Sequence, residues 1–109
     1  MATITIDDFR KVELRIATIT AAEPHPNADR LVVLKVNLGS EERQLVAGIR
    51  AHYAPEALLG KQIVVVANLE PATLRGVESQ GMLLAASDAE GHLAIVTPEK
   101  PIAAGGNVK

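Results

Sequence analysis

The sequence predicts an all-β domain, a small five-stranded Greek-key barrel with one short helix between its third and fourth strands. Five stretches either alternate apolar with polar residues or form short apolar runs, and a segment of helical character separates the third from the fourth. With 109 residues, 48% of them apolar, the chain is long enough to bury one core. No linker or repeat divides it, so we predict one domain over 1–109, with the barrel at about 4–87 and an extension at about 88–109.

The first elements are a helical turn and a strand. Asp7 is a candidate N-cap for a single turn that carries Phe9 inward. In residues 12–23, every second residue from Val12 to Ile16 is apolar, which predicts a half-buried strand with these side chains facing the core.

The second and third strands are expected to form a hairpin or meander. The loop 23–30, "EPHPNADR", holds two prolines and an Asn-Ala-Asp cluster that end the first strand. Residues 31–39 then place four apolar side chains on one face, as a strand does. A polar turn at 40–42 leads into a third strand over 43–49.

A short helix is predicted between Pro55 and Gly60, because proline suits a first helical position and glycine suits the residue after a helix. The fourth strand, 62–70, has few polar interruptions and is expected to be buried on both faces. The fifth strand is 81–87, residues 92–98 form a further short strand, and 105–109 form a tail.

This element order is that of the oligonucleotide-binding (OB) type of Greek-key barrel. An antiparallel sandwich with an incidental helix is the alternative.

The composition argues against catalysis. There is no cysteine, which removes disulfides, thiol catalysis and cysteine-ligated zinc, and is compatible with a reducing, cytoplasmic location. The three histidines, His25, His52 and His92, are scattered and are expected to be exposed loop or turn residues. Ser79 lacks a G-x-S-x-G context. We therefore predict no catalytic residue, no metal and no cofactor, and no apolar run suggests a membrane span.

Two loops are rich in polar and conformationally special residues. In a barrel of this type, the loop joining strands one and two and the loop joining strands four and five flank one binding groove. Here these loops are 23–30 and 70–80. Arg30 and Arg75 offer forked donors for phosphates, and Met82 offers a soft apolar surface for a base. The net charge of −2 counts against a strongly basic domain but leaves room for a local basic face, and the 2% aromatic content excludes a platform of stacked aromatic rings.

The same residues also fit a purely structural interpretation. Two glycines serve a tight turn, Ser79 caps it, Met82 fills the core, and Arg75 pairs with Glu78.

Four stretches together resemble the tRNA-binding domain family: "IDDFRKVELRIATI", "HPNADRLVVLKVNLG", "RQLVAGIRAHYAPEALLGKQIVVVANLEP" and "LRGVESQGMLLAA". The family includes the C-terminal domain of bacterial methionyl-tRNA synthetase, its freestanding relatives, and domains of synthetase-associated cofactors. The resemblance runs from about Ile4 to Ala86, and the ending "GGNVK" is similar to the synthetase C-terminus. It implies a non-catalytic OB barrel that grips structured tRNA, a homodimer paired through C-terminal segments, and the synthetase catalytic domain as a further partner.

Carried over residue by residue, the resemblance implies RNA contacts at six positions, namely Asn27, Arg30, Asn68, Arg75, Ser79 and Met82. The facing of the predicted strands adds Lys35 and Arg50. Loop-shaping roles fall to Asp29, Gly76 and Gly81, and we expect Asp29 and Asn68 to order their loops through backbone hydrogen bonds.

One position departs from the family pattern. Ala47 stands where relatives have a small polar residue, so we expect a hydrogen bond to RNA to be missing there. A distant branch related to export chaperones shares the barrel but departs from "NADRL" and from the "GI" at Gly48–Ile49. A peptide-binding, chaperone-like dimer is therefore the alternative function. A dimerisation domain with vestigial RNA binding is another.

Overall fold

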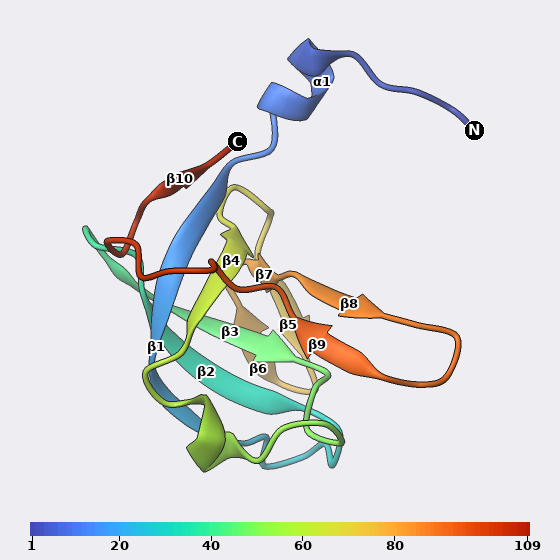
Figure 1. Ribbon diagram of the computed structural model, residues 1–109. Helices are drawn as coiled ribbons and strands as arrows, with labels where there is room; N and C mark the ends of the chain where they lie inside the picture. Colours follow the sequence, from blue (N-terminus) through green and yellow to red (C-terminus); the bar gives the residue numbers. More distant parts are fainter.

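The computed structural model describes residues 1–109 and confirms the five-stranded barrel (Figure 1). Its strands are β1 (Leu14–Pro24), β2 (Val32–Asn37), β3 (Glu42–Ala47), β4 (Gln62–Val66) and β7 (Met82–Leu83). They pair antiparallel in the order β3-β2-β1-β4-β7. The two outer strands of this order, β3 and β7, do not pair with each other, so the barrel is nearly but not fully closed.

Several smaller elements lie outside the five barrel strands. They are α1 (Ile6–Arg10), the 3-10 turn η1 (Pro55–Leu58), β5 (Ala72–Leu74), β6 (Val77–Ser79), β8 (Ala85–Ser87), β9 (Leu93–Ile95) and β10 (Asn107–Val108). The helix predicted between the third and fourth strands is η1, and its Leu58 is fully buried. The β5–β6 and β8–β9 pairs are hairpins, and β10 pairs with β1. No helix is long and apolar enough to cross a membrane.

The core is aliphatic, as the shortage of aromatic residues requires. Fourteen buried residues form it, with contributions from β1 to β4, η1, β7 and β9. The fourth strand is buried on both faces as predicted, because Ile63 and Val65 face the core while Val64 and Val66 are buried outside it.

The predicted facing of the first strand is wrong. Ala17 and Ile19 line the core, whereas Ile16 is buried on the outer face of β1. The reason is the C-terminal segment, which covers that face: the Ile16 N–H donates to the Gly106 carbonyl at 2.8 Å, and the Gly105 N–H donates to the Ile16 carbonyl at 2.7 Å. Alternation located the strand, but a shift of one residue exchanges its two faces.

The C-terminal segment packs on its own barrel. Val108 of β10 pairs with Leu14, and the Ile102 N–H donates to the Gln62 side-chain carbonyl at 3.0 Å. Gly39 and Gly105 meet backbone to backbone: a Cβ on Gly105 would lie 2.3 Å from the Leu38 carbonyl oxygen. Ile95 also belongs to the core, so residues beyond 87 help to fill the barrel.

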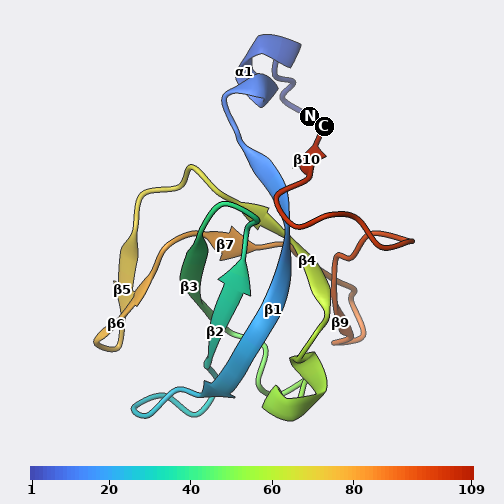
Figure 2. The same ribbon diagram turned by 90° about the vertical axis from the view of Figure 1, so that its left-hand side faces the viewer.

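The N-terminal turn differs from the prediction. Thr5, not Asp7, is the N-cap, because the Asp8 N–H donates to the Thr5 hydroxyl at 3.1 Å. No residue of α1 is buried, so Phe9 does not point inward. Figures 1 and 2 show α1 standing away from the barrel, at the same end of the molecule as the C-terminus. Loop 25–31 lies at the opposite end in both views.

Candidate nucleic-acid interface

The second predicted loop is a β-hairpin, β5–β6, with an exposed cation at its tip. Arg75 and Gly76 occupy the turn with φ of 52° and 88°, and two positive φ values are typical of a tight two-residue hairpin turn. A Cβ on Gly76 would meet nothing within 4 Å, so this glycine serves the turn and not a close approach. Arg75 is exposed, and the predicted alternative of an ion pair with Glu78 does not form.

Ser79 and the adjacent Gln80 anchor the base of this hairpin to β3. The Val46 N–H donates to the Ser79 hydroxyl at 2.9 Å, and that hydroxyl donates to the Gly81 carbonyl at 2.9 Å. Gln80 and Gln44 exchange two further hydrogen bonds, at 2.8 and 3.0 Å. Ser79 is only 4% exposed, so its burial conflicts with the predicted RNA contact and fits the structural interpretation.

Gly81 and Met82 follow on the barrel. Gly81 has φ of 144°, and a Cβ there would lie 2.9 Å from the Val66 carbonyl oxygen. Its close approach is therefore to the barrel itself. Met82 is 47% exposed, which excludes the interpretation that it fills the core.

His25 connects the two predicted loops through hydrogen bonds, and the prediction that its side chain is exposed is wrong. The ring is buried, with 3% exposed. Nδ1 accepts from the Asn27 N–H at 2.9 Å, so in the neutral ring Nε2 carries the proton and donates to the Leu74 carbonyl, also at 2.9 Å. Loop 25–31 thus meets the β5–β6 hairpin, as the barrel topology predicted. The Pro-flanked loop pointed to local order, but nothing in the sequence identified Leu74 as the partner. His52 and His92 are exposed, as expected.

The predicted RNA-contacting cations are free of ion pairs. In the first half of the chain, Arg10, Lys11, Arg15 and Arg43 each pair with a carboxylate. Arg30, Lys35, Arg50 and Arg75 form no ion pair. Among the basic residues of the first half of the chain, Arg30, Lys35 and Arg50 are therefore the three without an ion pair. These are the three that were predicted to contact RNA from their places in the loops and strands.

These cations lie around the two loops and β2–β3. The Arg50 N–H donates to the Arg30 carbonyl at 3.3 Å, which sets the two residues side by side. Lys35 is opposite Gln44 in the β2–β3 register, and the Gln44 side-chain amide donates to the Glu78 carbonyl at 2.8 Å. The hairpin therefore runs beside Lys35.

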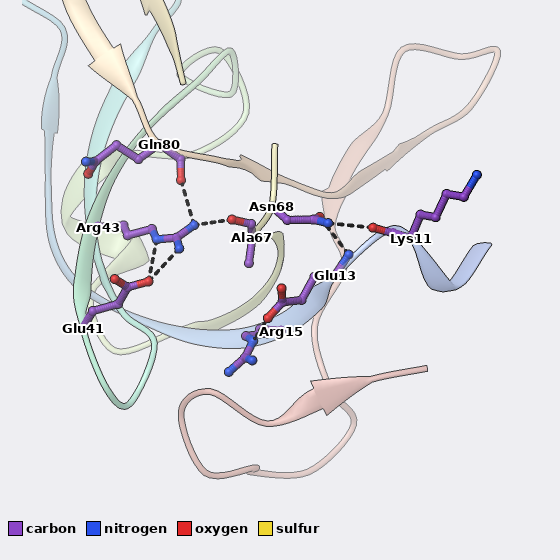
Figure 3. Close-up of polar contacts among 8 residues, drawn as sticks. All are labelled: Lys11, Glu13, Arg15, Glu41, Arg43, Ala67, Asn68 and Gln80. Carbon is purple, nitrogen blue, oxygen red and sulfur yellow. Dashed lines mark hydrogen bonds and ion pairs between the residues drawn. The ribbon is translucent and has the colours of Figure 1, made fainter. Parts of the chain in front are cut away.

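The side chains of Asn68 and Arg43 hold the two ends of the segment between β4 and β7, which contains the β5–β6 hairpin (Figure 3). Asn68 accepts from the Glu13 N–H at 2.8 Å and donates to the Lys11 carbonyl at 2.6 Å. This is the backbone-ordering role expected of it. Arg43 donates to the carbonyls of Ala67 and Gln80, the latter at 3.3 Å, and pairs with Glu41 at 2.6 Å. No motif or spacing in the sequence indicates this role for Arg43, because both of its carbonyl partners are distant along the chain.

The remaining predicted positions are in loop 25–31 or at the end of β3. Asn27 and Asp29 are exposed, and the Asp29 side chain makes none of the expected backbone hydrogen bonds. Ala47 is buried in the core cluster and offers no polar group. No cluster of three or more histidine and carboxylate side chains is arranged to hold a metal ion.

Known proteins are similar to this chain both in sequence and in fold. The family model "Putative tRNA binding domain" matches residues 14–107. The methionine–tRNA ligase of Thermococcus kodakarensis is 52% identical over 109 residues, which are 100% of this chain and 15% of that ligase. The chain thus spans a small part of the length of this relative.

Two solved structures have the same fold. The MetRS-related protein from Pyrococcus horikoshii superposes with a TM-score of 0.94 at 34% identity, covering 100% of both chains. The chaperone CsaA from Bacillus anthracis superposes with a TM-score of 0.90 at 30% identity, covering 99% of this chain and 100% of that one. Because the family model covers most of the chain, the chain belongs to the family described as "Putative tRNA binding domain".

Proposed function

We propose that this chain is a non-catalytic module that binds tRNA through shape and backbone contacts more than through base sequence. One observation carries the proposal: two loops joined by His25 lie beside four cations, Arg30, Lys35, Arg50 and Arg75, that no carboxylate neutralises. Forked guanidinium donors suit phosphate oxygens, and phosphate contacts supply affinity without sequence choice. Asn27 in the first loop and Met82 at the start of β7 are exposed, and they add contacts to sugar or base.

The module acts beside a methionyl-tRNA synthetase catalytic domain in the cytoplasm, either as part of the same chain or as a freestanding aid. Tethering a second tRNA-binding surface to an enzyme raises the local concentration of tRNA without new chemistry. The support is the family membership together with the ligase that shares this segment.

Titration with total tRNA at several salt concentrations tests the proposal. Each phosphate contact contributes about 0.7–0.9 to the slope of log affinity against log salt, so four contacts give a slope of about −3. A peptide-binding barrel, the alternative favoured by the likeness to a chaperone, gives no such slope. Failure of the unmodified chain to bind total tRNA at moderate salt contradicts the proposal.

Arg75→Ala is expected to weaken binding of different tRNAs by a similar factor, about fivefold, and to reduce the salt slope by about 1, because it removes one phosphate contact. The exposed side chain makes no ion pair or hydrogen bond, so thermal unfolding should be unchanged. Lys100→Ala is the matched control, since it removes an exposed, unpaired cation away from the loops. Equal binding by the two variants would remove Arg75 from the interface.

We infer that the module works as a homodimer. The support is the apolar surface at the end of the molecule that holds both termini, where Ile4, Ile6, Phe9 and Val12 are all exposed. A small protein rarely leaves such a surface uncovered. We propose that the C-terminal segment, which leaves Ile102 42% exposed, takes part in the same interface. Light scattering is expected to give twice the chain mass of 11.5 kDa, and a monomer at micromolar concentration would contradict this.

A further inference from the structure

The barrel has an open seam between β3 and β7. Three hydrogen bonds close its first part: the Val46 N–H donates to the Ser79 hydroxyl, the Gln44 N–H donates to the Gln80 side-chain carbonyl, and the Gln80 N–H donates to the Gln44 carbonyl. Beyond Val46 no hydrogen bond crosses between the two walls. A hollow of about 380 Å³ lies there, and we call it the seam slot. One wall is formed by Ala47, Gly48 and Ile49, and the other includes Met82, Leu84 and Ala85.

The slot combines apolar walls with one exposed donor and one exposed acceptor. All of its lining residues except Gly48 are hydrophobic. Gly48 is exposed, and neither its N–H nor its C=O has a hydrogen-bond partner in the protein. The face of a nucleobase suits apolar walls, while its edge carries both donors and acceptors. The volume lies near the lower end of the range for small-molecule sites, about 300–1,000 Å³, which suits one nucleotide and not a helix.

Two free guanidinium groups belong to residues beside the slot. Arg50 follows the lining residue Ile49, and its N–H donates to the Arg30 carbonyl at 3.3 Å. Leu31, which follows Arg30 in the chain, places a methyl group 3.8 Å from the position that a Cβ on Gly48 would occupy. Neither arginine forms an ion pair. An apolar slot beside two unneutralised cations has the charge pattern of a nucleotide, with an uncharged base and an anionic phosphate.

We propose that the seam slot binds one unstacked nucleotide of the RNA, with its base against Met82 and its phosphate held by Arg30 and Arg50. The inference rests on the proposed function and adds that the RNA must present an unpaired nucleotide. A single N–H and C=O pair can bond to an edge of any base, so the slot selects unpaired over paired RNA without selecting base identity.

Gly48→Leu tests the slot, because it adds a bulky side chain at a residue that lines it. Gly48 does not have the left-handed backbone that disfavours other residues, and only the Leu31 methyl group is near. The probes are a short single-stranded RNA carrying one 2-aminopurine and an RNA duplex of the same length. Gly48→Leu is expected to weaken single-strand binding about tenfold, the effect of losing one base contact, and to change duplex binding less than twofold. Ala94→Leu is the matched control, since Ala94 is exposed and follows the lining residue Leu93 on the opposite face of β9.

Ala85→Leu fills the slot from the other wall and guards against a folding defect in the first variant. Parent-like single-strand binding by both variants, or unchanged 2-aminopurine emission on saturating the unmodified chain, overturns the proposal. It is also overturned if an unfolded polypeptide binds the unmodified chain and both variants lose that binding while keeping their affinity for RNA. In each of these cases the chain still binds tRNA. If the unmodified chain binds no tRNA, the proposed function itself is wrong.

Discussion

Gly105→Ala is expected to lower the free energy of unfolding by about 3 kcal/mol. About 1 kcal/mol comes from the left-handed backbone, because φ at Gly105 is 89°. About 2 kcal/mol comes from overpacking, since the new Cβ would lie 2.3 Å from the Leu38 carbonyl oxygen and one of the two backbones must move. Urea unfolding followed by circular dichroism measures the loss.

Gly91→Ala separates these two causes. Gly91 has φ of 88°, nearly the value at Gly105, but a Cβ there would meet nothing within 4 Å. The control should therefore lose only about 1 kcal/mol. Equal losses in the two variants would show that the C-terminal segment is not held against the β2–β3 turn as the structure places it.

Arg43→Ala is expected to lower the free energy of unfolding by about 2–4 kcal/mol and to weaken tRNA binding as well. Arg43 is mostly buried, with 25% of its side chain exposed, and it holds two backbone carbonyls at the ends of the hairpin connection. Hydrogen bonds to a charged group contribute about 1.5–3 kcal/mol each, but the partial exposure of Arg43 and the 3.3 Å length of its bond to Gln80 reduce the total. Their loss also leaves the Ala67 and Gln80 carbonyls without this donor. Urea unfolding and tRNA titration on the same preparation give both quantities.

Arg15→Ala is the matched control for Arg43→Ala. Arg15 also pairs with a carboxylate, Glu13, but its side chain is 40% exposed and donates to no backbone carbonyl. Ion pairs at exposed sites contribute about 0–1 kcal/mol, so this variant should be nearly as stable as the parent. If Arg43→Ala kept full stability but lost tRNA binding, Arg43 would contact RNA directly and would not be a support for the hairpin.

The barrel and the meeting of its two loops were predictable because both depend on local patterns. Apolar alternation and the Pro55–Gly60 segment gave the element order, and that order brings the two loops together. Long-range partners were not predictable. The outward face of Ile16 depends on a C-terminal segment about 90 residues away, and the burial of His25 and Ser79 depends on Leu74 and Val46. For a residue such as Ser79, both an RNA contact and a structural role fit the sequence, and only the position of its long-range partner Val46 decides between them.

The arrangement of the two chain ends has a practical consequence. Both termini emerge at one pole of the molecule, and loop 25–31 occupies the other (Figures 1 and 2). A fluorophore, affinity tag or neighbouring protein module joined to either terminus would therefore leave this loop unobstructed. The same geometry would let the domain be grafted onto an unrelated enzyme with that loop pointing away from its host.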